Sequence, residues 1–408
     1  MSLADRQVIK ALKIGKVPAV GASRLATGRD LEIAEIGRIL NDIAQGSSEV
    51  RLLRGDYGSG KTFMCSVVRE LAFQRGFAVS IVNLNRDVPF GKRDLVLDQI
   101  IGGLRTNDSP NDPAFGAIVE TWFGRFSLDI PLEENDELKA ALHDVSKLDA
   151  GFAMGLRGWL RGYVEGESES MDASLTWIRG QAITAEQRSR LRVVGKVTPD
   201  TAFRRLKAIL RFMHDAGFPG TVVLLDEAES IMRLQSTQRL AAYTSLRELI
   251  DTCEVDFPYS FFLFAGTQPL FEDPSRGIAS YEALYQRIRN QASSSERDLR
   301  QAIIRLEELD GASLVAVAKR VRDLHATAYD WNARAAFNDG DIDKFTVDVA
   351  TRFGEIRQKP RAFLKALVDT LDAKQQGLSS VGAADAVESA IAIVESGDMP
   401  QLEDVVLA

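Results

Sequence analysis

Cysteine and histidine are scarce in this sequence, which has only two cysteines, Cys65 and Cys253, and three widely separated histidines. Two cysteines cannot build a disulfide framework, and no spacing of cysteine and histidine fits a zinc site. We therefore expect both thiols to be buried structural residues, and we expect no zinc centre.

Long apolar runs are also missing. No stretch approaches the roughly 18 consecutive apolar residues that a membrane-spanning helix requires. The first residues, MSLADRQVIKALK, contain no apolar segment of the kind found in secretory signals. The sequence thus predicts a cytoplasmic protein with no membrane partner.

The sequence also lacks an excess of positive charge. It has 50 Lys and Arg against 58 Asp and Glu, which gives a net charge of −8. Such a balance disfavours a protein that coats DNA through bulk positive potential, although it leaves a local basic patch open. The composition, 45% hydrophobic and 26% charged, is typical of a folded globular protein. At 408 residues we expect two or three structural units.

A glycine-rich turn is the most informative feature that is present. The stretch RGDYGSGKTF lies between an apolar run and a helical pattern, and it matches G-x-x-x-x-G-K-[ST] in the strand-to-helix context that a P-loop requires. The glycines let backbone N–H groups surround a phosphate, Lys61 would pair with the β- and γ-phosphates, and Thr62 would ligate Mg²⁺. The predicted nucleotide-binding residues are Gly55, Asp56, Tyr57, Gly58, Ser59, Gly60, Lys61, Thr62 and Phe63. The motif therefore predicts ATP and Mg²⁺ as cofactors.

A pair of carboxylates ends the apolar run in TVVLLDEAES. Asp226 and Glu227 would be costly at the end of a buried strand unless they meet a cation or hydrogen-bond donors. We predict that Asp226 holds the Mg²⁺ shell through water and that Glu227 polarises the attacking water as a general base. The alternative is two acids that cap the next helix. Because an aspartate alone would suffice for a nucleotide-dependent switch, Glu227 favours hydrolysis.

Four further residues are candidates for assisting the reaction. Thr267, at the end of the strand in FFLFAGTQPLF, would orient the attacking water, or it belongs to an ordinary strand-end turn. Arg287 and Arg289 lie in ALYQRIRNQ, where one would serve a neighbouring subunit as an arginine finger, or both form surface salt bridges. Arg361 begins a helical pattern in KPRAFLKAL and would reach the γ-phosphate from a lid, or it faces water.

The apolar runs in FAVSIVNL, TVVLLDEAES and YSFFLFAGTQ are continuous, which is typical of strands covered on both faces. We predict an α/β fold with a parallel-sheet P-loop NTPase core. The expected units are a helical N-terminal extension (1–46), the core (47–300), a mostly helical insertion within it at about 105–198, a C-terminal helical lid (301–377) and a helical tail (378–408). After residue 300 we expect helices only, with a weaker one at 382–395.

The insertion is the region whose ligand the sequence does not identify. Its tryptophans, Trp122, Trp159 and Trp177, and its arginines, Arg157, Arg161 and Arg179, could together form a surface for a strand of nucleic acid. The interpretation that we favour places the tryptophans in the core and the arginines in solvent.

Together these elements resemble the AAA+ class of P-loop ATPases. A closer resemblance, over nearly the whole chain, is to the ATP-binding proteins of BREX-type phage-defence systems. It is carried by RQVIKALKIGKVPAVGASRLATG, RGDYGSGKTF, FAVSIVNLNRDVPFGK, GFPGTVVLLDEAESI, FLFAGTQPLFED, RLEELDGASLVAVAKRVRDLHATAYDW and KPRAFLKALVD. By position, the resemblance gives the roles described above to Lys61, Thr62, Asp226, Glu227, Thr267 and Arg361. It does not choose between Arg287 and Arg289.

The resemblance implies an ATPase of prokaryotic antiviral defence, with helicase-like or other DNA-acting proteins as partners and DNA itself as a candidate ligand. A lid arginine and an arginine finger imply a homo-oligomer, since a finger acts on a neighbouring subunit. Such a protein would load or remodel a DNA-acting partner or DNA. Two alternatives stay open: a nucleotide-dependent scaffold or sensor with little turnover, and a loader related to replication initiators.

Overall fold

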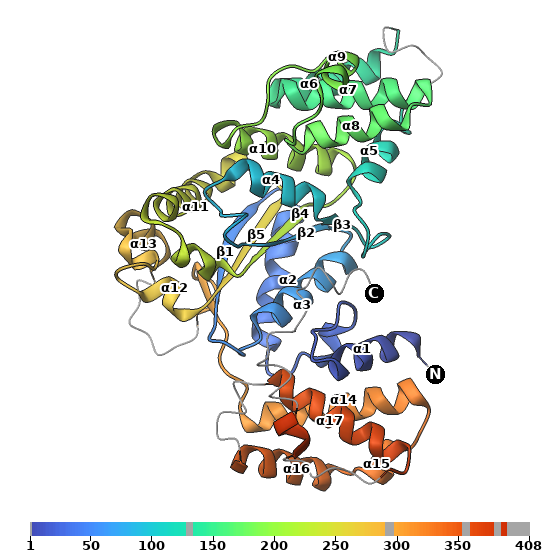
Figure 1. Ribbon diagram of the computed structural model, residues 1–408, viewed down its shortest axis with the longest axis vertical. Helices are drawn as coiled ribbons and strands as arrows, with labels where there is room; N and C mark the ends of the chain where they lie inside the picture. Colours follow the sequence, from blue (N-terminus) through green and yellow to red (C-terminus); the bar gives the residue numbers. More distant parts are fainter. Residues whose placement is uncertain (1, 128–133, 290–297, 353–359, 379–384, 390–408) are drawn as a thin grey trace.

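A computed structural model describes residues 2–127, 134–289, 298–352, 360–378 and 385–389 of the chain. Within these residues a six-stranded sheet has the order β3-β2-β4-β5-β1-β6 (Figure 1). The strands are β1 (Ser48–Arg54), β2 (Ala78–Asn83), β3 (Leu104–Arg105), β4 (Thr221–Asp226), β5 (Ser260–Gly266) and β6 (Ile303–Arg305). All neighbours pair in parallel except β2 and β3. The predicted α/β class with a mainly parallel sheet is confirmed.

The central strands are buried on both faces, as their continuous apolar runs predict. In β4, Val222 and Leu224 face one apolar cluster, whereas Val223 and Leu225 face another. The first cluster is covered by α2 (Asp30–Ala44) and α3 (Lys61–Gln74). The second is covered by α4 (Arg93–Gly102), α10 (Pro199–Asp215) and α11 (Ser236–Asp256). The sheet is therefore the middle layer of three.

Between β3 and α10 the chain forms a group of helices that we name the insertion lobe. Its helices are α5 (Phe115–Phe123), α6 (Asp136–Leu148), α7 (Ala150–Glu165), α8 (Ser168–Ile178) and α9 (Ala185–Leu191). Trp122, Trp159 and Trp177 are 4%, 2% and 5% exposed, and Trp159 stacks on Phe123 with ring centroids 5.3 Å apart. The favoured core interpretation of the tryptophans is confirmed, and the idea of an aromatic nucleic-acid surface is wrong because these rings pack inside the lobe.

A second group of helices, the lid bundle, has an apolar cluster of its own. It contains α1 (Leu3–Lys13), α14 (Gly311–Tyr329), α15 (Ala333–Ala336), α16 (Asp339–Arg352) and α17 (Pro360–Gln375). The N-terminal helices that we expected to form one extension do not pack together. Helix α1 packs with the lid helices, whereas α2 packs on the sheet.

The expectation of helices alone after residue 300 is wrong at β6, which pairs with β1 in parallel. Three residues are too few to show a periodic signal, so only the pairing partner reveals the strand. Of the weaker helix expected at 382–395, residues 385–389 are described and helical, and the remainder lies outside the described residues.

Short elements complete the chain: η1 (Ala22–Leu25), η2 (Ala228–Arg233), α12 (Gln268–Glu272), η3 (Ile278–Ser280) and α13 (Glu282–Ile288). Cys65 and Cys253 are buried, as predicted. In the part of the chain that the structure describes, no helix combines the length and apolar character needed to span a bilayer.

Candidate nucleotide-binding site

The glycine-rich loop joins β1 to α3 and has the backbone that its sequence predicts. Gly58 and Gly60 have φ angles of 83° and 91°, in the left-handed region that side chains with a Cβ atom disfavour. Gly60 is the residue before the first turn of α3. The unpaired N–H groups and the positive dipole end of this 14-residue helix therefore border the loop, and together they favour an anion.

Lys61 lies along the loop. Its Nζ donates hydrogen bonds to the carbonyl oxygens of Gly55, at 3.0 Å, and of Asp56, at 3.1 Å. Burial lowers the pKa of Lys61, whereas the negative charges of Glu229 and Asp226 act in the opposite direction. The loop carbonyls thus hold the ammonium group at the position where a phosphate would compete for it.

Thr62 and Asp226 meet although 164 residues separate them. The Thr62 hydroxyl donates to Asp226 Oδ2 at 3.0 Å, and Asp226 Oδ1 accepts from the backbone N–H of Glu227 at 2.9 Å. Within the described residues no group of three or more His, Cys, Asp or Glu side chains forms a metal cage. One hydroxyl and one carboxylate fit Mg²⁺, which usually keeps several waters and takes its other ligands from phosphates.

Glu227 has an unusual backbone conformation. Its φ of 55° lies in the left-handed region, which is uncommon for a residue with a long side chain and costs on the order of 1 kcal/mol. Burial raises the pKa of Glu227, and the adjacent Asp226 raises it further. In the described part of the chain no group donates a hydrogen bond to the Glu227 carboxylate. Both of its oxygens are therefore available to accept a proton, or a hydrogen bond from water.

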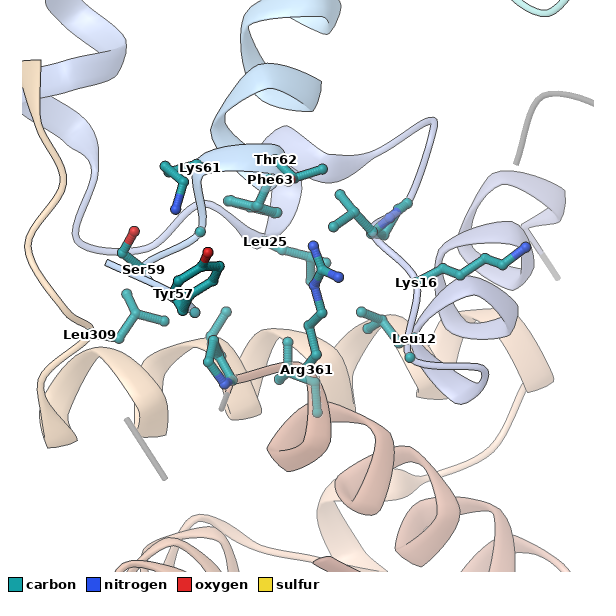
Figure 2. Close-up of a pocket in the computed structure, with 18 of the residues that line it drawn as sticks. Leu12, Lys16, Leu25, Tyr57, Ser59, Lys61, Thr62, Phe63, Leu309 and Arg361 are labelled. Atoms are coloured by element: carbon teal, nitrogen blue, oxygen red, sulfur yellow. The ribbon is translucent and has the colours of Figure 1, made fainter. Parts of the chain in front are cut away.

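A cavity of about 550 Å³ opens beside these residues, between the sheet and the lid bundle (Figure 2). Lys61, Asp226 and Glu227 line its charged end. Its apolar wall comes from α1, the segment after it and the lid, and consists of Leu12, Val17, Pro18, Leu25, Leu309, Val317 and Leu364. Cavities of this size and mixed lining bind small ligands. One end suits phosphates and the other suits a flat apolar group such as a base.

Arg361 extends into the cavity from the first turn of α17 (Figure 2). Burial lowers the pKa of its guanidinium, while the charge of Asp226 acts in the opposite direction. The side chain nevertheless remains accessible to solvent through the cavity. Arg361 is thus a lid residue that faces the P-loop with a positive charge.

The segment after α1 is held against α3 by a carboxylate. Glu70 of α3 accepts hydrogen bonds from the backbone N–H groups of Gly21, Ala22 and Ser23, the last two at 3.0 and 2.8 Å. Because α3 also begins at the P-loop, this contact fixes one wall of the cavity relative to the phosphate end.

Two residues at the site carry no motif and were not predicted. Arg29, 5% exposed, donates to the carbonyls of Ser59 at 3.0 Å and Glu307 at 2.6 Å, and so joins the P-loop to the segment that leads into the lid. Glu229 lines the cavity, and its Oε2 atom is buried without a hydrogen-bond partner in the described residues. The only sequence signal for Glu229 is that it follows Glu227 by two positions.

Three candidates lie away from the cavity. Thr267 is 3% exposed at the end of β5, and it does not belong to the cavity lining. Arg287 forms an ion pair with Asp251 on the surface, and Arg289 ends α13. Of the predicted residues, the P-loop, Asp226, Glu227 and Arg361 therefore meet at the cavity of one chain, and any finger would act on another copy.

The family model "BREX system ATP-binding protein BrxC/D" matches residues 2–381. Among curated proteins, none matches this sequence.

Two solved structures are distantly similar to the chain. The Aeropyrum pernix ORC2 protein, in ADPNP-ADP complexes, is 14% identical with a TM-score of 0.45, covering 90% of this chain and 68% of that one. The Walker-type ATPase PABY2304 of Pyrococcus abyssi is 12% identical with a TM-score of 0.44, covering 93% and 75%. The family match carries the assignment, since it spans nearly the whole chain.

Proposed function

The chain belongs to the family of BREX system ATP-binding proteins, and from this premise we propose that it hydrolyses ATP. We propose further that it uses the cycle to load or remodel a DNA-acting partner, or DNA itself, in prokaryotic antiviral defence. The observation that carries the proposal is the hydrogen bond between Thr62 and Asp226, at 3.0 Å, in a cavity that Lys61, Glu227 and Arg361 also line.

Each residue of the site has a distinct task in this proposal. The loop backbone and Lys61 bind the phosphates, and Thr62 and Asp226 hold Mg²⁺, which neutralises charge on the phosphates when bound. Glu227 takes the proton of the attacking water, for which its raised pKa suits it better than an ordinary glutamate. Arg361 stabilises charge on the terminal phosphate from the lid side.

The oligomeric part of the proposal rests on Arg287 and Arg289, which lie outside their own chain's cavity. We propose that one of them completes the site of a neighbouring copy, and that Thr267 orients water through its neighbours at the end of β5. We also propose that the core with its insertion, the lid together with α1, and the tail act as the separate units of this oligomer.

Turnover by the wild type, Glu227→Gln and Lys61→Ala tests the proposal, with and without DNA. Glu254→Gln, an exposed glutamate on α11, is the matched control. We expect Glu227→Gln to bind a fluorescent ATP analogue normally and to lose on the order of 100-fold or more in turnover. Lys61→Ala should lose binding itself. A wild-type rate no higher than that of Glu227→Gln under every condition would overturn hydrolysis.

Size measurement with ATP tests the oligomer. Glu227→Gln should accumulate as an ATP-bound oligomer, whereas Lys61→Ala should not assemble. A monomer in both variants and in the wild type contradicts the oligomer.

A scaffold or sensor with little turnover is the second candidate function. The absence of any hydrogen bond to the Glu227 carboxylate within the described residues favours it, because a general base is normally oriented by a neighbour. In that case the ATP analogue binds and assembly occurs, but turnover stays at the level of Glu227→Gln.

A further inference from the structure

Several arginines in and beside the insertion lobe are neutralised by carboxylates. Arg179 lies 2.7 Å from Asp98, and Arg205 lies 2.8 Å from Asp149. On α9, Arg190 lies 3.5 Å from Glu186. These arginines stabilise the lobe, and their charge is already balanced within the chain.

Four arginines on α7 and at the end of α9 differ from this pattern, and we name them the α7–α9 arginine cluster: Arg157, Arg161, Arg188 and Arg192. In the part of the chain that the structure describes, none of the four forms an ion pair. Arg188 and Arg192 are exposed, and Arg157 and Arg161 are half-buried. The cluster is therefore a positive surface within a chain whose net charge is −8.

A hydrogen bond brings α7 and the end of α9 together within the cluster. The guanidinium of Arg161 donates to the carbonyl of Leu191, which is the last residue of α9, so Arg161 lies beside Arg192. On α7, Arg157 precedes Arg161 by four residues, so this pair shares a helix face with Cβ atoms about 5–6 Å apart. Arg188 lies in the last turn of α9, and Arg192 directly follows that helix with a left-handed backbone.

The charges within the cluster repel one another. Burial lowers the pKa of Arg161, and the positive charges of Arg192 and Arg157 lower it further, while the charge of Glu165 acts in the opposite direction. The acids next to α9, Glu167 and Glu186, face Arg190. Like charges held together without an ion-paired carboxylate among the described residues favour an anion from outside the chain.

From this arrangement we propose that the α7–α9 arginine cluster binds the phosphate backbone of a nucleic acid. Planar guanidinium groups match phosphate oxygens in pairs, and arginines from α7 and from the end of α9 together fit a polymer of evenly spaced charges. Trp159 and Trp177 are buried, so neither ring is available as the aromatic anchor that protein interfaces and base-stacking sites use. The contact is therefore sequence-independent.

The location separates this surface from the nucleotide cavity. In Figure 1, α7 and α9 lie at the opposite end of the molecule from α14 and α17, with the sheet between them. Nucleic-acid binding at the cluster thus requires neither ATP nor hydrolysis, and it goes beyond the function proposed above.

A double variant in α9 tests the surface. Arg188→Ala with Arg192→Asn removes two charges, and asparagine tolerates the left-handed φ of 55° at position 192. Arg204→Ala with Arg211→Ala is the matched control, because these exposed arginines are paired with Asp149 and Asp215. Fluorescence anisotropy with a labelled 20-base-pair duplex and a 20-nucleotide strand, at two salt concentrations, measures binding by the full-length proteins.

We expect the α9 variant to bind both probes at least about tenfold more weakly at low salt. The slope of log binding constant against log salt concentration should decrease in magnitude by about two. The control should match the wild type, as should Lys61→Ala, which separates this surface from the ATPase site. Arg157→Ala, on α7, should weaken binding by itself without touching the end of α9.

Equal binding by the wild type, the α9 variant and Arg157→Ala would overturn the proposal. So would a wild type that binds neither probe but binds a polyglutamate peptide, since the partner of the cluster would then be an acidic protein.

Discussion

The lid bundle and the insertion lobe are both helical and lie at opposite ends of the sheet (Figure 1), yet they are attached in different ways. Leu138 and Phe152 of the lobe belong to the same apolar cluster as Val223 of β4. The lid has a cluster of its own, to which Leu12 and Leu367 belong. The lobe thus continues the core, whereas the lid is a separately packed body.

This difference explains where the nucleotide cavity lies. A cavity forms where the side chains of two surfaces do not pack fully against each other. The boundary between the sheet and the lid is such a place, because the lid packs around its own apolar cluster. Arg29 bridges it through the carbonyls of Ser59 and Glu307. An occupant of the cavity would contact both bodies, so nucleotide binding should depend on the lid and not on the lobe.

The largest effect should come from truncating one buried leucine in each body. Leu12→Ala in the lid and Leu156→Ala in the lobe should each lower the free energy of unfolding by about 2–5 kcal/mol, because both side chains are buried. Only Leu12 lines the cavity. Denaturant unfolding measures both losses of stability, and titration of the ATP analogue should show weaker nucleotide binding for Leu12→Ala alone. An equal loss of nucleotide binding in Leu156→Ala would contradict the view that binding depends on the lid and not on the lobe.

A smaller effect is expected from the polar network that joins α1 to the lid. Asp372 of α17 accepts from Lys13 Nζ at 2.5 Å and from His325 Nε2 at 2.9 Å. His325 Nδ1 accepts from the Trp331 indole at 2.9 Å, so its Nε2 carries the proton. Asp372→Asn should cost about 1–3 kcal/mol of unfolding free energy.

The pH dependence of this loss follows from the pKa of Asp372. Burial raises that pKa, but hydrogen bonds from His325 and Lys13 outweigh the burial and keep it below its usual value of 3.8. The contribution is therefore fully present above the unfolded pKa and is lost as pH falls through the lower folded value. Thermal unfolding at neutral and acidic pH checks this, with the exposed Asp144→Asn as control. A difference that stays constant as the pH is lowered to 2 would refute the ionic account.

The smallest effect should come from Arg361→Ala. Its guanidinium faces the P-loop from the lid, so we expect ATP to bind about tenfold more weakly, about 1.4 kcal/mol, with a smaller change for ADP. Arg157→Ala, in the lobe, should leave both affinities unchanged. Equal losses for ATP and ADP would show that Arg361 does not contact the terminal phosphate.

Local patterns predicted much of the site. The glycine turn predicted the P-loop, because Gly58 and Gly60 adopt backbone angles that glycine permits and other residues resist. The continuous apolar run of β4 predicted a buried strand with Asp226 at its end. Arg29 and Glu229 were not predictable in this way, since neither belongs to a spacing pattern and both reach the cavity only through the fold.

The strand, turn and helix of the P-loop could be read from the sequence, because they depend on interactions between residues close in the chain. The class of ligand then followed from that motif. The tertiary structure was needed to show that α1 belongs to the lid, that β6 completes the sheet, and that Arg161 of α7 lies beside Arg192 at the end of α9. The physical reason is distance along the chain. Lys13 and Asp372 are 359 residues apart, and no local pattern encodes which distant surfaces exclude water from each other.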